Sequence, residues 1–137
     1  MHALFHGDIV ERLVQGAEQA LLTAGIPQSN IRHFSAPGSF EIPLIGDALL
    51  KEDTVDALIG LGVIVEGETH HARLLAEAAS RGIMDVQLRH SAPFAFEILY
   101  VKDIAQAQVR AQGDRNKGAE AALAVLHALA QLKAIRL

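Results

Sequence analysis

The apolar residues of this chain follow two patterns that alternate along its length. Residues 56–65 form a nearly continuous apolar run, which is typical of a strand buried on both faces of a parallel sheet. Residues 94–101 predict another strand, with Glu97 as its only charged member. Between these runs the apolar residues recur at helical spacing. Strands that alternate with helices predict an α/β fold whose parallel sheet is covered on both faces.

The helices predicted from this spacing have recognisable ends. The first begins at Asp8, which can cap its start, and ends before Gly25 and Pro27. A long helical pattern begins after the central strand, near residue 70, and Gly82 interrupts it without ending it. The shorter elements are a strand at 31–36, a helix at 40–50 capped by Ser39, a helix at 104–110 capped by Asp103, and a last helix at 119–132. Residues 1–5 are too few for a strand to be predicted there.

The composition argues against several classes of protein. With 137 residues, the chain is expected to form one domain. It contains no cysteine, so disulfides, thiolate nucleophiles and cysteine metal ligands are absent, which fits a reducing compartment. The net charge of −4 argues against nucleic-acid binding, because phosphate neutralisation needs clustered Lys and Arg and here the twelve are scattered.

The hydropathy of the chain bears on its location. No stretch has the roughly 18 consecutive apolar residues of a membrane span, and the N-terminal residues do not have the pattern of a signal peptide. We therefore expect a cytoplasmic protein with no membrane partner. Half of the residues are hydrophobic although only 4% are aromatic. This composition suits a small α/β protein or a subunit that buries surface against copies of itself.

Polar residues gather where the central strand ends. Glu66, Glu68 and Thr69 follow the run at 56–65, just before the helix that starts near residue 70. Open α/β sheets bind their ligands outside the carboxyl ends of the strands. The sequence therefore predicts a functional site at this turn from strand to helix.

Three segments resemble one known family. They are residues 36–43 (APGSFEIP), 62–71 (GVIVEGETHH) and 116–122 (NKGAEAA). In this order and at these separations they resemble lumazine synthase, the penultimate enzyme of riboflavin biosynthesis, from about Phe5 to the last helix. The resemblance implies condensation of 5-amino-6-(D-ribitylamino)uracil with 3,4-dihydroxy-2-butanone 4-phosphate to give 6,7-dimethyl-8-ribityllumazine, phosphate and water.

The resemblance also implies an architecture. It implies a flavodoxin-like three-layer sandwich with a four-stranded parallel sheet, in which the N-terminal strand is truncated because only four residues precede Phe5. It further implies small-molecule substrates, no cofactor and no metal. The active sites would lie at contacts between neighbouring subunits of a homo-oligomer built on pentamers.

By this resemblance, Glu68, Thr69 and Arg110 lie at the positions that bind the phosphate of the butanone substrate. A helix start offers backbone N–H groups and the positive end of the helix dipole, and an arginine adds a planar charged fork. Glu68 would bind through its backbone N–H, because its carboxylate would repel an anion. Taken alone, Thr69 is also typical of a helix cap, and Arg110 of a solvated residue at a helix end.

His71 lies at the position of the family's proton donor. The ordinary histidine pKa of about 6.5 suits proton transfer near neutral pH. His70 is one residue earlier and therefore about 100° away around the helix, so the two side chains do not point into one site. This spacing also argues against a zinc site, for which helical pairs are three or four residues apart. Taken alone, either histidine is also typical of an exposed first turn.

The resemblance implies a slot for the flat pyrimidine ring and its ribityl chain. Phe5 and Phe96 match positions that contact the ring from different subunits, with Phe5 as the stacking face. The other matched residues are Ser39, Phe40 and Glu41 for the ribityl chain and ring edge, and Val63, Ile64 and Val65 for the slot wall. Lys117 is a further candidate near the charged end of the substrate, and is also typical of a solvated lysine. Taken alone, Phe40 and Phe96 are also typical of core packing, and Glu41 of a first-turn carboxylate favoured by the helix dipole.

Two features depart from the family pattern. The loop between Arg110 and Asn116 is one residue shorter than the common form. Glu97 stands where a glycine is frequent, next to Phe96. A charge at that position must either face solvent or pair at a subunit contact.

Three other functions fit the sequence less well. An archaeal-type riboflavin synthase has the same fold, but residues 36–43 and 67–71 argue against it. A flavin- or lumazine-binding protein would have no need to retain His71, Thr69 and Arg110 together. A phosphoacceptor receiver domain needs clustered carboxylates and a lysine at its strand ends, and this sequence does not provide them.

Overall fold

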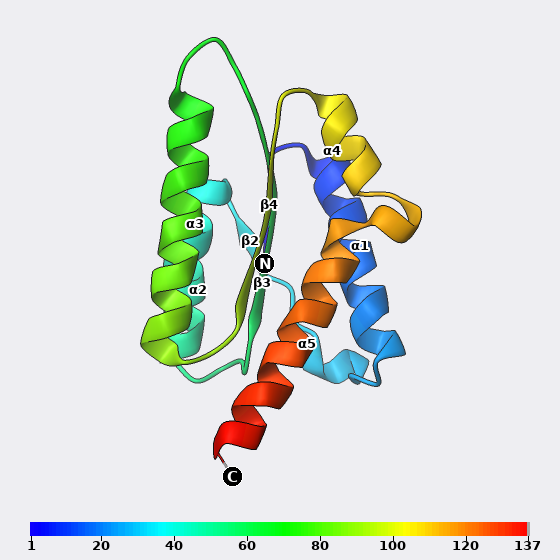
Figure 1. The fold of residues 1–137 in the computed structure, drawn as a ribbon, viewed down its shortest axis with the longest axis vertical. Helices are drawn as coiled ribbons and strands as arrows, with labels where there is room; N and C mark the ends of the chain where they lie inside the picture. Colours follow the sequence, from blue (N-terminus) through cyan, green and yellow to red (C-terminus); the bar gives the residue numbers. More distant parts are fainter. Residues whose placement is uncertain (137) are drawn as a thin grey trace.

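The chain folds in three layers, with a sheet between two layers of helices (Figure 1). The computed structural model describes residues 1–136. The strands are β1 (His2–Ala3), β2 (Ser35–Ala36), β3 (Leu58–Val65) and β4 (Phe94–Val101). The helices are α1 (Gly7–Thr23), α2 (Ile42–Lys51), α3 (His71–His90), α4 (Ile104–Arg110) and α5 (Lys117–Arg136). Short 3-10 turns lie at Gln28–Asn30 (η1), Ser39–Glu41 (η2) and Gly113–Arg115 (η3).

The four strands form one parallel sheet in the order β2-β1-β3-β4. β3 and β4 pair from Leu58 opposite Phe94 to Val65 opposite Val101. The chain passes from β1 outward to β2, then returns to place β3 on the other side of β1. The strand order therefore reverses between β1 and β3, and the crevice outside their carboxyl ends is where such a sheet binds ligands.

Each face of the sheet has its own hydrophobic cluster. On one face, α2 and α3 cover the alternate β3 residues Leu58 and Ile64. On the other face, α1, α4 and α5 cover Leu61 and Val63. Figure 1 shows the two layers on either side of the sheet. Because side chains alternate across a strand, the unbroken apolar run of β3 supplies both clusters, as the sequence predicted.

The predicted cap of the first helix is wrong. α1 begins at Gly7, and its N-cap is His6 in the left-handed conformation, with a φ of 55°. Asp8 therefore lies in the first turn, where its negative charge is favourable to the helix dipole. The predicted end is confirmed: Gly25 has a φ of 91°, and its N–H donates to Leu22 O at 3.0 Å.

The segment that follows is more irregular than predicted. Only Ser35–Ala36 of the strand predicted at 31–36 pairs with β1. Ser39 does not cap a helix, because it belongs to the 3-10 turn η2, and α2 begins only at Ile42. Further along the chain, Asp103 is confirmed as the cap of α4, since its Oδ1 accepts a hydrogen bond from the Gln106 N–H at 3.0 Å.

Two residues fix the start of α5 against α1. A methyl group on Gly118 would overlap the carbonyl group of Leu13, so only a glycine lets the two helices come this close. Asn116 makes four side-chain hydrogen bonds to backbone groups, at 2.9–3.2 Å, with Arg12, Ala111, Gly118 and Ala119. The NKG motif thus has a structural role at Asn116 and Gly118. It also starts α5 two residues earlier than predicted.

α5 is the one helix among residues 1–136 that is long and apolar enough to cross a membrane, by length and composition only. No such span is predicted from the sequence, because charged and polar residues interrupt the apolar residues of this segment. One side of α5, with Ala122 and Val125, is buried in this chain. Leu123 is 57% exposed and Ile135 is 78% exposed. An apolar surface of this kind also suits contact with another copy of the chain.

Candidate active site

Phe5 and the turn η2 meet at the carboxyl end of β1 and β2. A methyl group added to Gly38 would lie 3.3 Å from Glu41 Oε2 and 3.5 Å from Phe5 Cε2, so the carboxylate and the ring are neighbours. Phe5 is 67% exposed and Phe40 is 56% exposed. Two aromatic side chains are therefore open to a ligand or to another chain at this edge of the sheet.

Ser39 joins the same turn to the central strand. It is 7% exposed, and a methyl group on Gly62 of β3 would lie only 2.5 Å from its Oγ. The glycine therefore lets η2 approach β3 closely. This contact holds Phe40 and Glu41 beside the end of the strand.

The three valine and isoleucine positions at the end of β3 lie against the core. Val63 and Ile64 are buried, and Val65 is half-buried. Their side chains pack into the two hydrophobic clusters, so what they can offer a ligand is the backbone at the strand end.

The turn from β3 into α3 carries the residues predicted for phosphate binding and proton transfer. Glu68, Thr69 and His71 are all exposed there. The backbone N–H of His71 donates to Thr69 Oγ1 at 3.3 Å, so the hydroxyl satisfies one of the free N–H groups of the first turn. Thr69 and His71 are thus brought together at the N-terminus of a 20-residue helix, where the helix dipole favours an anion.

We call Phe5, η2, the end of β3, Glu68, Thr69 and His71 the crevice group. They lie at the carboxyl ends of the strands, near the point where the strand order reverses, and they include the turn from strand to helix at which the sequence predicted a site. No group of three or more His, Cys, Asp or Glu side chains in residues 1–136 is arranged to hold a metal ion.

The remaining predicted residues lie elsewhere. Arg110 ends α4, and its Nη1 donates to Gln106 O at 2.8 Å. Lys117 starts α5, and its Nζ donates to Glu120 Oε2 at 2.7 Å. Both line a surface hollow of about 360 Å³ with Val109, Asp114, Arg115 and Glu120. We call these six residues the α4–α5 group. Phe96 is 40% exposed on the edge strand β4.

The two groups are separate in one chain. η2 and α3 pack on the face covered by α2, whereas α4 and α5 cover the opposite face (Figure 1). Within residues 1–136, no hydrogen bond or ion pair joins Arg110, Lys117 or Phe96 to a residue of the crevice group. A single copy therefore does not bring all the predicted site residues together.

Glu97 of β4 faces the layer that contains α4 and α5. It is opposite Leu61 in the pairing of β3 with β4, and Leu61 faces the α1–α5 layer. Burial raises the pKa of the Glu97 carboxyl to about 7; the positive charge of Lys117 opposes this shift and the negative charge of Glu120 adds to it. In the sequence, Glu97 was notable as the one charge in an apolar strand and as a departure from a frequent glycine, and both signals pointed to its unusual environment.

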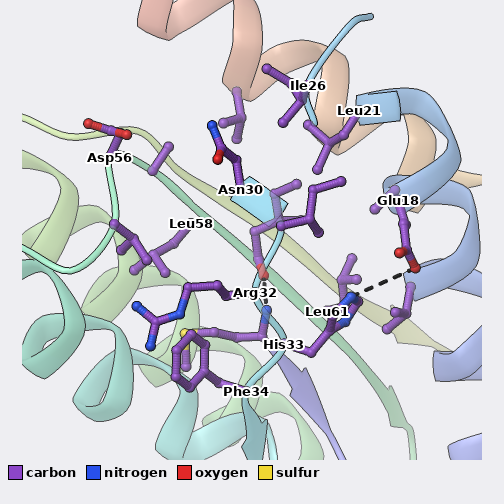
Figure 2. A pocket seen from close by; sticks show the side chains of 18 of the residues that line it. Glu18, Leu21, Ile26, Asn30, Arg32, His33, Phe34, Asp56, Leu58 and Leu61 are labelled. Carbon is purple, nitrogen blue, oxygen red and sulfur yellow. Dashed lines mark hydrogen bonds and ion pairs between the residues drawn. The ribbon is translucent and has the colours of Figure 1, made fainter. Parts of the chain in front are cut away.

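A larger cavity, of about 460 Å³, lies at the other end of the sheet (Figure 2). Figure 2 shows Arg32, His33 and Phe34 on one wall, with Glu18 3.7 Å from His33 and Leu58 across the cavity. None of the predicted site residues lines it.

This cavity lies beside the start of β1. The ammonium group of Met1 donates to Ile59 O at 2.8 Å, so β1 begins there, and no strand lies between residues 32–34 and 57–59 among the described residues. Burial lowers the pKa of the Met1 ammonium to about 6. The cavity thus lies at the amino ends of the strands, and the predicted chemistry lies at their carboxyl ends.

Comparison with known proteins identifies the family. The family model described as 6,7-dimethyl-8-ribityllumazine synthase matches residues 1–133. The chain is 38% identical to the 6,7-dimethyl-8-ribityllumazine synthase of Deinococcus deserti over 128 residues. These aligned residues cover 93% of this chain and 82% of that protein. The chain belongs to the 6,7-dimethyl-8-ribityllumazine synthase family.

Two further relatives agree with this conclusion. The enzyme of the same description from Deinococcus radiodurans is 39% identical over 128 residues, covering 93% of this chain and 83% of that protein. The enzyme from Cytophaga hutchinsonii is 41% identical over 130 residues, covering 94% of this chain and 82% of that protein. The chain is thus a transferase with lumazine synthase activity in riboflavin biosynthesis, and the predicted flavodoxin-like fold is confirmed.

Proposed function

We propose that the crevice group and the α4–α5 group of two neighbouring copies together form the site of lumazine synthesis. There 5-amino-6-(D-ribitylamino)uracil condenses with 3,4-dihydroxy-2-butanone 4-phosphate to give 6,7-dimethyl-8-ribityllumazine, phosphate and water. The observation that carries this proposal is that η2 contacts Phe5, β3 and α3 at the carboxyl ends of the strands.

The pyrimidine substrate binds to the crevice group. The exposed ring of Phe5 stacks on the flat uracil, beside the carboxylate of Glu41. Ser39, Phe40 and Glu41 hold the ribityl chain and the ring edge. The backbone at Val63, Ile64 and Val65 forms the wall, and Phe96 closes the slot from the neighbouring copy.

The phosphate of the second substrate binds at the start of α3. Backbone N–H groups at Glu68 and Thr69, the Thr69 hydroxyl and the positive end of the helix dipole stabilise the dianion. Arg110 of the neighbouring copy adds a bidentate charged contact, with Lys117 beside it.

His71 moves the protons. Dehydration of the carbinolamine, loss of phosphate and ring closure each transfer a proton, and a histidine beside the phosphate-bearing carbons serves these steps. Otherwise the enzyme acts mainly by holding two reactants in reactive contact, which converts a bimolecular condensation into an effectively unimolecular step.

A contact between copies is supported by the separation of the crevice group from the α4–α5 group within one chain. The two groups lie on opposite faces of the sheet, so an oligomer in which the α4–α5 group of one copy meets the crevice group of the next completes the site. The exposed apolar residues of α5 provide surface for such contacts. We propose a homo-oligomer built on pentamers, working in the cytoplasm.

The direct test of the activity is to mix the protein with both substrates and follow lumazine fluorescence against a control without protein. We expect an acceleration that saturates in both substrates. A folded sample that binds the uracil or a flavin without accelerating the reaction would contradict the proposed function.

Arg110→Ala is expected to raise the KM for the butanone phosphate about tenfold, because a charge-assisted contact to phosphate contributes about 1.5 kcal/mol or more. The KM for the uracil substrate should change little. Steady-state kinetics with each substrate varied in turn measures both values. An equal rise for both substrates would mean that Arg110 does not bind the phosphate.

Mixing two impaired variants tests whether the site lies between copies, provided that activity is measured far below the KM for the butanone phosphate, where Arg110→Ala is slow as well. We expect His71→Ala and Arg110→Ala proteins, unfolded together and reassembled, to regain activity, because some contacts then join an intact crevice group to an intact α4–α5 group. The matched control mixes His71→Ala with Thr69→Ala. Both lie in the crevice group, so no site in that mixture is intact. Equal activity in the two mixtures would place the whole site in one chain.

A further inference from the structure

Arg115 is a cation of the α4–α5 group that has no role in the site as described so far. It is the last residue of the turn η3, and it is exposed. It lines the same hollow of about 360 Å³ as Arg110 and Lys117. The hollow is therefore lined by three positive charges, which come from α4, η3 and α5.

The backbone of Arg115 is fixed on both sides. Its N–H donates to Gln112 O at 3.2 Å, and the N–H of the next residue, Asn116, donates to Gly113 O at 3.2 Å. The side chain of Asn116 in turn donates to Arg12 O of α1 at 2.9 Å. The Arg115 side chain thus starts from a defined point at the hollow, so binding an anion there costs side-chain rotamer freedom but no ordering of a loop.

The three cations of the hollow differ in their existing contacts. Lys117 is ion-paired with Glu120 at 2.7 Å, and Arg110 Nη1 donates to Gln106 O at 2.8 Å. The Arg115 guanidinium forms no hydrogen bond or ion pair with another of residues 1–136. It can therefore bind an anion without giving up an existing contact.

The charge of Arg115 decides the sign of the hollow. Asp114 and Glu120 also line it, so three cations and two carboxylates give a net charge of +1. Without Arg115 the same residues are neutral together. A guanidinium is also planar and carries five N–H donors, which match two oxygens of a phosphate group.

We infer that Arg115 binds the phosphate of the butanone substrate, as a second charged fork beside Arg110. It gives the α4–α5 group its net attraction for a dianion. The uracil substrate carries no phosphate, so its binding does not depend on Arg115. This inference rests on the proposed binding of the butanone phosphate at Arg110 of the neighbouring copy.

The test is steady-state kinetics of the Arg115→Ala oligomer, with each substrate varied in turn. We expect the KM for the butanone phosphate to rise about fivefold, because a charge-assisted contact to phosphate is lost at an exposed site. The inhibition constant of inorganic phosphate, in competition with the butanone phosphate, should rise by the same factor. The kcat and the KM for the uracil substrate should stay within about twofold of the wild type.

Two further variants separate a phosphate contact from other effects of the substitution. Arg115→Lys keeps the charge and loses the fork, so its KM for the butanone phosphate should lie between those of the wild type and Arg115→Ala. Arg81→Ala is the matched control for the loss of one positive charge. Arg81 is exposed on α3, which covers the other face of the sheet, and both KM values should stay unchanged.

An unchanged KM for the butanone phosphate in Arg115→Ala would overturn the inference, and so would an equal rise in Arg115→Lys or in Arg81→Ala. Should Arg115→Ala not assemble, Arg115→Gln gives the same comparison. The proposed function fails differently: the wild-type oligomer would then show no synthase activity. An active enzyme in which Arg110→Ala raises this KM and Arg115→Ala does not would refute the inference alone.

Discussion

Replacing His71 with alanine is expected to lower kcat about 100-fold, because a positioned general acid or base typically contributes at least that factor. The affinity for the uracil substrate should change little, since Phe5 and η2 bind the ring. The backbone N–H of His71, which donates to Thr69 Oγ1, is retained in the variant, so the start of α3 is preserved. Steady-state kinetics and binding of the uracil alone measure the two effects separately.

His70→Ala is the matched control for this variant. His70 precedes α3 at the N-cap position and makes no side-chain cap hydrogen bond, so its removal leaves the helix start intact. We expect kcat close to that of the wild type. An unchanged kcat in His71→Ala would mean that His71 does not transfer the protons. An equal loss in both variants would point to damage at the helix start instead.

Gly118→Ala is expected to lower the free energy of unfolding by about 3 kcal/mol, which is the cost typical of overpacking in a tight core. The added methyl group would overlap the carbonyl of Leu13, which belongs to the backbone of α1 and has no rotamer to change. α5 would have to move away from α1 and would weaken the hydrogen bonds of Asn116 to Arg12. Urea denaturation at one fixed protein concentration measures the loss.

Gly7→Ala provides the comparison. Gly7 also starts a helix, but nothing lies within 4 Å of an added methyl group there. Its free energy of unfolding should stay within about 1 kcal/mol of the wild type, because alanine is the better helix former. A large loss in both variants would show that the α1–α5 contact is not the cause.

The parts of the fold that were predictable are those fixed by local pattern. β4 lies where the apolar run predicted it, at Phe94–Val101, and α3 continues through Gly82 because the apolar residues beyond it still face the sheet. Asp103 was predictable as a cap because the cap and the bonded N–H are three residues apart.

The errors came from features that depend on distant partners. Asp8 has the right chemistry for a cap, but the chain leaves β1 through a left-handed residue, His6, and the helix starts earlier. Ser39 is buried because Gly62 of β3 admits it there, and no local pattern around residue 39 contains that contact. The strand predicted at 31–36 pairs only at its end, because β1 reaches no further.

The candidate site divides into a part that local pattern indicates and a part that it does not. The position of Glu68, Thr69 and His71 followed from the end of an apolar strand and from resemblance to a family. The separation of Arg110 from them follows from the topology, which puts α4 and α3 on different faces of the sheet. No spacing along the sequence contains that information.

The close contact between α1 and α5 also affects how the protein is made. α1 leaves the ribosome first, yet its apolar residues Leu13 and Ala17 pack in the same cluster as Ala122 of α5. α5 is the last of the described elements to be synthesised, so the α1–α5 contact forms only after the sheet between them has been made. Contacts between residues this far apart in the sequence form slowly during folding. Until α5 packs, the apolar side of α1 is exposed to water, where partly folded chains associate.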